Sequence, residues 1–319
     1  MYDYFMEKLV WKKFILGIDN LDYILEKEVG GVIFFTKDIL SKNQFKDLIK
    51  DIKLKSKSPL FLSVDQEGGR VERTENISLK RLSAKYSYKK GEEFLKKQSE
   101  EISKELAAYG INLNFAPCID VNTNKNNPII GERAFSDNPE DVIKGMNIFV
   151  EASKKYGIIP CVKHFPGHGD ADKDSHLTLP QINLTLDEME KLHIKPFKIA
   201  VENGIDMLMI AHLHCKCFDE EIIPTSLSKN AMNYLRKKLN YNGVVISDDM
   251  IMQGVQGFGE LESLIMAINA GVDMFIYRNS DKKTLNLIKR LCEKIEKDEI
   301  LKTKILESDK RIQQLKNRL

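Results

Sequence analysis

Eight short apolar runs recur along the chain, and a more polar stretch follows each of them. The runs are rich in β-branched and aromatic residues, and they are apolar at consecutive rather than alternate positions. This pattern is typical of parallel strands that are buried on both faces. We therefore predict strands at 14–18, 31–35, 60–64, 111–117, 158–163, 207–212, 243–247 and 273–277.

The stretches between the runs carry helix signals. Asn138 followed by Pro139 is typical of a helix N-terminus, because asparagine can cap the free N–H groups and proline needs no partner there. Thr185 and Glu188 have the spacing of a capping box. Residues 281–319 show the pattern of two amphipathic helices.

Strands that alternate with helices in a chain of 319 residues predict an α/β fold, a (β/α)8 TIM-type barrel. We expect one catalytic domain over residues 1–319, with the helices of 281–319 packed on the barrel. A doubly wound open sheet is the alternative, because periodicity alone does not prove closure. The glycine pairs at 30–31 and 68–69 lack the spacing of a dinucleotide fingerprint, which argues against a nicotinamide cofactor.

The charge balance and the cysteines narrow the range of partners. The 49 Lys and Arg against 47 Asp and Glu leave a net charge of +2, which gives no electrostatic case for nucleic acid or an anionic membrane. No apolar run reaches the ~20 residues of a membrane helix, and the N-terminus does not resemble a signal peptide. The five cysteines are scattered, which argues against a disulfide framework. We expect a monomer in a reducing cytoplasm.

Polar residues stand at the C-terminal ends of five predicted strands. In a barrel these ends form one face, and barrel enzymes carry their active sites there. Any one such residue could be a helix cap or a loop residue, but five ends on one face favour a catalytic site. The residues are Asp65, Asp120, Lys163, His164, His212, Asp248 and Asp249.

Five segments at these ends closely resemble a known family. They are "SVDQEGGRVER", "NFAPCIDVN", "GERAFSDNPEDV", "KHFPGHGDADKDSH" and "GVVISDDM", in this order. Together they resemble the single-domain bacterial β-N-acetylhexosaminidases of glycoside hydrolase family 3. The similarity runs from about residue 14 to the end of the chain.

The resemblance implies a role for each matching residue. Asp248 corresponds to the nucleophile, His176 to the general acid/base, and Asp174 to the residue that orients this histidine. The resemblance also implies a mobile loop that brings His176 to bound substrate, and it implies no metal and no organic cofactor. The residues that correspond to the sugar-binding positions are Asp65, Arg73, Arg133, Lys163 and His164.

The expected activity is that of a retaining exo-β-N-acetylglucosaminidase. By resemblance, the substrate is a small carbohydrate, the GlcNAc-terminated muropeptides of peptidoglycan recycling. Asp248 must stay ionised to attack the anomeric carbon, and nearby cations such as Lys163 would lower its pKa. A histidine that changes protonation near neutral pH, such as His176, can first donate and then accept the proton.

A metal-dependent barrel hydrolase is the main rival from the residues alone. "AHLHCKC" at 211–217 offers two histidines and two cysteines to a soft metal. Alternate residues of a strand share one face, so all four cannot converge without a turn. We interpret His212 as a wall of the active site and the cysteines as incidental. His168 has no assigned role, and His193 is expected inside a helix.

Three other functions share the fold. A catalytically dead sugar-binding module is disfavoured, because Asp248, Asp174 and His176 are all present. A family 3 β-glucosidase would usually take its acid from a second domain. A glycoside phosphorylase stays open, because a neutral histidine does not repel phosphate. We read Gly167 and Gly169 as letting the backbone approach the sugar.

Overall fold

Eight parallel strands close into a barrel in the computed structural model, which describes residues 4–171 and 179–319. Each strand pairs with its neighbours in sequence order, and β1 pairs with β10 to close the ring. Each of the eight predicted runs overlaps a barrel strand, so the (β/α)8 prediction is confirmed and the open sheet was wrong. The strands are β1 (Phe14–Leu16), β2 (Gly31–Phe34), β3 (Phe61–Val64), β4 (Leu113–Asn114), β5 (Ile159–Phe165), β7 (Met207–Ile210), β9 (Val244–Asp249) and β10 (Met274–Tyr277).

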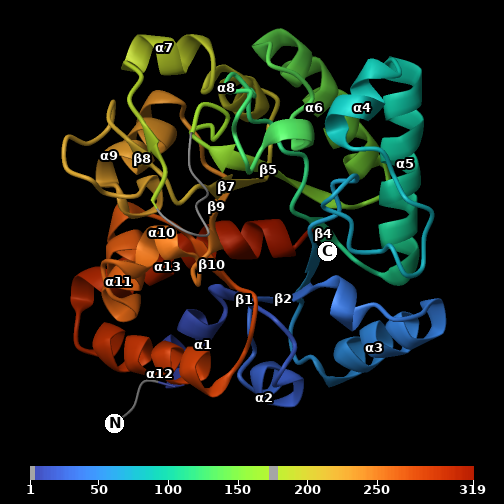
Figure 1. Ribbon diagram of the computed structural model, residues 1–319. Coiled ribbons are helices and arrows are strands. Elements are labelled where there is room, and N and C mark those ends of the chain that lie inside the picture. Colours follow the sequence, from blue (N-terminus) through green and yellow to red (C-terminus); the bar gives the residue numbers. More distant parts are fainter. Residues whose placement is uncertain (1–3, 172–178) are drawn as a thin grey trace.

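Helices surround this ring of strands (Figure 1). Asn138 caps α6 by accepting the N–H of Glu140, and Thr185 forms a capping box with Glu188 at α7, as predicted. The helices are α1 (Tyr4–Trp11), α2 (Leu21–Glu26), α3 (Lys42–Lys55), α4 (Ala84–Lys89), α5 (Glu92–Tyr109), α6 (Pro139–Lys155), α7 (Leu186–Lys191), α8 (Lys195–Glu202), α9 (Lys229–Asn233), α10 (Gln253–Gln256), α11 (Glu260–Ala270), α12 (Lys282–Glu296) and α13 (Glu299–Lys316). Among the described helices, none has the length and apolar character needed to cross a bilayer.

The strands are apolar throughout because their two faces bury different neighbours. In β1, Ile15 belongs to a cluster inside the barrel, whereas Phe14 and Leu16 pack in the larger cluster between the barrel and the helices. The same alternation places Ile33 of β2 inside and Val32 outside. Both faces of a strand are therefore dry, which explains the unbroken apolar runs.

The last helix, α13, closes the N-terminal end of the barrel. Its Ile312 and Leu315 belong to the interior cluster, and Figure 1 shows the helix in red across the middle of the ring. Lys316 Nζ donates to the carbonyl of Pro59, which precedes β3, at 2.8 Å. Arg311 Nε donates at 2.9 Å to Asp273, which precedes β10. The opposite end of the barrel is left for the site.

Lys13 is buried beside this closing helix at a cost in stability. Its side chain is 1% exposed, its Nζ has no hydrogen-bond partner among the described residues, and Asp309 lies 3.9 Å away. Burial lowers the pKa of Lys13 to about 7. The unfolded chain therefore binds one more proton than the folded protein between about pH 7 and pH 10, so this lysine makes stability rise with pH in that window.

Lys13→Met should therefore raise the free energy of unfolding by about 1–3 kcal/mol near pH 7, because an apolar side chain has no charge to desolvate. The gain should shrink as pH rises from about 7 toward the ordinary lysine pKa of about 10.4, and above that value the lysine becomes neutral in both states. Urea denaturation at several pH values measures it. Lys96→Met, at an exposed position of α5, serves as the matched control. A gain that does not change with pH would contradict the explanation.

Candidate active site

Charged side chains gather where the barrel strands end. Asp65 follows β3, Asp120 lies after β4, Lys163 and His164 belong to β5, and Asp248 lies at the end of β9. These strands are parallel, so their C-terminal ends form a single rim. The predicted clustering at this face is therefore observed.

Two cations, the buried Lys163 and the partly buried Arg133, are fixed by carboxylates at this rim. Lys163, which is 2% exposed, places its Nζ 2.7 Å from Asp65 Oδ1 and 2.6 Å from Glu67 Oε1. Arg133 binds the same Glu67 with two hydrogen bonds, from Nε at 2.9 Å and from Nη2 at 2.8 Å. Burial disfavours the charge of Lys163, but Asp65 and Glu67 outweigh it and raise the pKa of Lys163. Both cations therefore stay charged and held in place.

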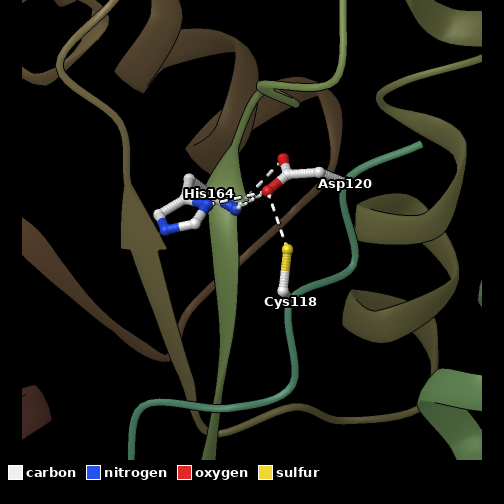
Figure 2. A group of neighbouring side chains, drawn as sticks. All are labelled: Cys118, Asp120 and His164. Atoms are coloured by element: carbon white, nitrogen blue, oxygen red, sulfur yellow. Dashed lines mark hydrogen bonds and ion pairs between the residues drawn. The ribbon is translucent and has the colours of Figure 1, made fainter. Parts of the chain in front are cut away.

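A buried carboxylate orients His164. Asp120 Oδ2 lies 2.7 Å from His164 Nδ1, and Asp120 also accepts the backbone N–H of His164 (Figure 2). Asp120 accepts the backbone N–H of His168 as well. On its other side, His164 Nε2 lies 3.3 Å from Arg133 Nη2. Arginine can only donate, so Nε2 accepts and the proton sits on Nδ1, directed at Asp120. The ring orientation of His164 is thereby fixed from both sides.

Cys118, Asp120 and His164 also place three potential metal-ligand atoms within 4.8 Å of one another, the single such group among the described residues. Their hydrogen bonds give a different explanation of the group. Cys118 Sγ donates to Asp120 at 3.2 Å, and burial raises the pKa of this thiol well above its usual range. A metal would have to displace that proton and the one on His164 Nδ1. We assign the group to positioning of the histidine.

Asp248 and Asp249 are adjacent carboxyls whose pKa values are shifted in opposite directions. Burial alone would raise the pKa of Asp248, but His164, His212, the N–H of Asp249 and Lys163 together lower it. Burial raises the pKa of Asp249 to about 6, and the Arg278 guanidinium 2.8 Å away only partly opposes this. Neighbouring groups whose pKa values are driven apart are typical of catalytic sites. At neutral pH, Asp248 is the more strongly ionised of the two.

His212 lies close enough to Asp248 for the two side chains to interact electrostatically. Its Nδ1 is 2.8 Å from Ser226 Oγ, whereas its buried Nε2 has no partner among the described residues. Burial lowers the pKa of His212, so the ring is neutral. A neutral imidazole with one unpaired nitrogen can bind a hydroxyl of a ligand.

The structure brings together four of the five predicted sugar-binding residues, namely Asp65, Arg133, Lys163 and His164. The Arg73 guanidinium forms no hydrogen bond to this network among the described residues, and it lies 5.6 Å from the ring centre of Phe35, which follows β2. Asp174 and His176 lie outside the described residues.

The sequence interpretation missed Glu67, and it gave Asp120 a place but no role. The signal for Glu67 was available, because "VDQEGG" carries a second acid two residues after Asp65 at the same strand end. Nothing in the sequence showed that this carboxylate pairs with Arg133, 66 residues away.

One further prediction needs correction. His193 lies in the turn between α7 and α8 rather than inside a helix.

Gly167 and Gly169 allow close approach of other parts of the protein. A Cβ at Gly167 would lie 2.6 Å from His193 Cβ, and one at Gly169 would lie 1.7 Å from the Val121 carbonyl oxygen. Gly167 also has a φ of +122°, which other residues rarely adopt.

Paired charges at the C-terminal ends of the strands of a (β/α)8 barrel are typical of barrel enzymes, which carry their active sites at this face. Residues 16–315 match the model of the glycosyl hydrolase family 3 N-terminal domain. The chain belongs to this family, and the predicted resemblance to its β-N-acetylhexosaminidases is confirmed by the relatives below.

The similar proteins include β-hexosaminidases from two bacteria and a solved structure. Beta-hexosaminidase A of Pseudoalteromonas piscicida is 33% identical, over 93% of this chain and 55% of its own length. The β-hexosaminidase of Photobacterium profundum is 36% identical, over 83% of this chain and 79% of its own. The structure of a family 3 β-N-acetylglucosaminidase from Paenibacillus superposes with a TM-score of 0.92 at 30% identity, over 98% of this chain and 62% of that one. The chain thus spans little more than half of some relatives.

Proposed function

We propose that this chain is a retaining exo-β-N-acetylglucosaminidase that removes terminal β-GlcNAc from muropeptide fragments in the cytoplasm. Asp248 attacks the anomeric carbon and forms a covalent glycosyl intermediate, which water then hydrolyses. His176, oriented by Asp174, first protonates the leaving oxygen and then activates the water. No metal or organic cofactor takes part in this scheme.

The observation that carries the proposal is the state of Asp248. It is a partly buried carboxyl at the end of β9 whose pKa is lowered by His164, His212, an N–H group and Lys163. A carboxylate that attacks a sugar must be ionised, and the substrate must be able to reach it while bulk water is largely excluded. The adjacent Asp249, whose pKa burial raises to about 6, is less suited to this task.

The fixed charges around Asp248 supply groups for recognition of a sugar. Asp65 can accept hydrogen bonds from two adjacent hydroxyls, while Lys163 and Arg133 donate to others. Each of these groups is held by an ion pair before any ligand arrives. Sites of this kind discriminate strongly, since a substrate without the matching hydroxyl leaves a buried polar group unpaired.

The names of the relatives support the choice of the sugar. The Photobacterium protein is a β-hexosaminidase, and the Paenibacillus structure is that of a β-N-acetylglucosaminidase. A screen of chromogenic β-GlcNAc, β-glucoside and β-xyloside substrates, each with and without phosphate, tests the choice. We expect hydrolysis of the β-GlcNAc substrate at the highest kcat/KM. A rate that depends on phosphate, with a sugar phosphate as product, would instead identify a phosphorylase.

Covalent trapping tests the mechanism separately from the substrate. A 2-fluoro sugar with a good leaving group should leave an adduct that peptide mass spectrometry locates on Asp248. If no adduct forms while the acetamido group of the substrate proves essential, attack by the substrate's own acetamido oxygen is the better mechanism.

His176→Ala should slow substrates with poor leaving groups by about 10²–10⁴-fold, because these need protonation of the departing oxygen. Substrates with activated aryl leaving groups should lose far less in the first chemical step. Steady-state kcat/KM across a series of aryl leaving groups measures the difference. His193→Ala, in the turn between α7 and α8, is the control for loss of a histidine. Equal losses for good and poor leaving groups would remove the acid role.

A further inference from the structure

Two cysteines meet at the end of the short strand β8 (His214–Cys215). Cys215 is the last residue of the strand, and Cys217 lies in the turn that follows it. The two Sγ atoms are 3.2 Å apart, and both cysteines are reduced. The N–H of Phe218 donates to the carbonyl of Cys215 at 3.0 Å, which closes the turn that holds Cys217 beside Cys215.

The two thiols differ in access and in freedom to move. Cys215 is 1% exposed and packs in an apolar cluster with Ile182, Met189 and Leu213. Its backbone is fixed, because β8 pairs with β6 (Gln181–Ile182) and the N–H of Lys216 donates to the Ile182 carbonyl. Cys217 is partly exposed at the edge of the cluster and has no strand partner. A reagent in solution therefore reaches Cys217 first.

The contact between the sulfurs also makes the accessible thiol the more reactive one. The hydrogen bond between the two sulfurs lowers the pKa of Cys217, whereas the same bond together with burial raises the pKa of Cys215. The thiolate is the nucleophile in thiol chemistry, so Cys217 attacks and Cys215 keeps its proton until the second step.

The other three cysteines lack these properties. Cys118, Cys161 and Cys292 are buried, and burial raises the pKa of each thiol. A soft metal is a poorer explanation of the pair, since no third ligand atom from the described residues completes a metal-binding group with the two sulfurs. In particular, His214 Nδ1 is engaged with the Ile223 carbonyl at 3.3 Å.

We propose that Cys215 and Cys217 form a reversible dithiol–disulfide site whose oxidant is a low-molecular-weight disulfide of the oxidised glutathione class. The Cys217 thiolate attacks one sulfur of the oxidant, forms a mixed disulfide and releases one thiolate. Cys215 then gives up its proton and attacks Cys217 Sγ, and the second thiolate leaves. In balance, two protein thiols and one small disulfide give one protein disulfide and two small thiols.

The site accommodates this change with little movement. Cys215 is held by strand pairing, so the turn residue Cys217 covers the remaining distance to a bonded pair. Oxidation requires no contact with Asp248 or with the charged network around Lys163. The inference is therefore independent of the proposed glycosidase activity.

The test uses the folded, fully reduced protein treated with oxidised glutathione. The number of titratable thiols should fall from five to three, and the intact mass should fall by two hydrogens. Peptide mapping after acid quench should place the disulfide between Cys215 and Cys217, and dithiothreitol should restore all five thiols. A lasting glutathione adduct on Cys217, a disulfide that involves another cysteine, or no reaction of the folded protein would each overturn the proposal.

Single variants separate the two steps. Cys215→Ala should stop at the mixed disulfide, with one glutathione on Cys217. Cys217→Ser should not react at all, because Cys215 is buried. Cys292→Ser is the matched control and should still lose two thiols on oxidation. Far-UV circular dichroism of each variant establishes that it is folded, and an internal disulfide in Cys215→Ala would contradict the pairing.

Discussion

Asp248→Ala should lower kcat on a chromogenic β-GlcNAc substrate by at least about 10⁴-fold, equivalent to about 5.5 kcal/mol of transition-state stabilisation. The reason is that, in the proposed mechanism, Asp248 is the carboxylate that attacks the anomeric carbon, so its loss would remove the covalent step. Initial rates with saturating substrate measure the effect. Added azide should partly restore turnover of the variant, because a small anion can enter the space of the missing carboxylate.

Asp249→Asn is the matched control for this experiment. Asp249 accepts the N–H of Ile251 at 3.2 Å and pairs with Arg278, so it supports the geometry of the strand end. We expect this variant to keep at least ten times the activity of Asp248→Ala. Activity of Asp248→Ala within about tenfold of the wild type would remove Asp248 as the nucleophile.

Glu67→Leu should lower the free energy of unfolding by about 3–5 kcal/mol, because it removes the counter-charge of the partly buried Arg133 and leaves the buried Lys163 with Asp65 alone. Glu140→Leu removes a carboxylate from an exposed ion pair with Lys195, and it should cost at most about 1 kcal/mol. Urea denaturation of both variants, with the wild type, gives the comparison.

The effect of Glu67 should also depend on pH. Arg133 and Lys163 outweigh the effect of burial and lower the pKa of Glu67 in the folded protein. Its contribution is therefore fully present above the unfolded value of about 4.3 and is lost as pH falls below it. The stability difference between the wild type and Glu67→Leu should narrow in acid. A difference that stays constant down to about pH 3 would show that Glu67 acts through packing instead of charge.

The sequence predicted those parts of the fold that depend on residues close together in the chain, such as strands and helix caps. Each barrel strand was visible because strands dry on both faces must be apolar at every position. The caps Asn138 and Thr185 were visible because a cap satisfies N–H groups only two or three residues away. Amphipathic helices were also visible in 281–319, but the pattern could not show that Ile312 of α13 enters the barrel interior.

The candidate site was predictable in its location and less so in its connections. The predicted strand ends indicated Asp65, Lys163 and Asp248 as site residues, because a parallel barrel brings these ends together. The pairing of Glu67 with Arg133, and of Asp120 with His164 across 44 residues, depends on tertiary contacts that no local pattern encodes. The family resemblance was the source of the expected catalytic roles. The structure identified the carboxylates that fix Lys163, Arg133 and His164.

The position of α13 has a consequence for the synthesis of the protein. The ring closes only when β10 reaches β1, and its N-terminal end is covered only when Ile312 and Leu315 of α13 enter it. About 300 residues separate β1 from that point, which at ordinary translation rates amounts to on the order of 15–60 s. During this interval the nascent chain exposes the apolar lining of an open sheet. The nascent chain should therefore need chaperones until α13 emerges, because α13 covers apolar side chains of strands that were made much earlier.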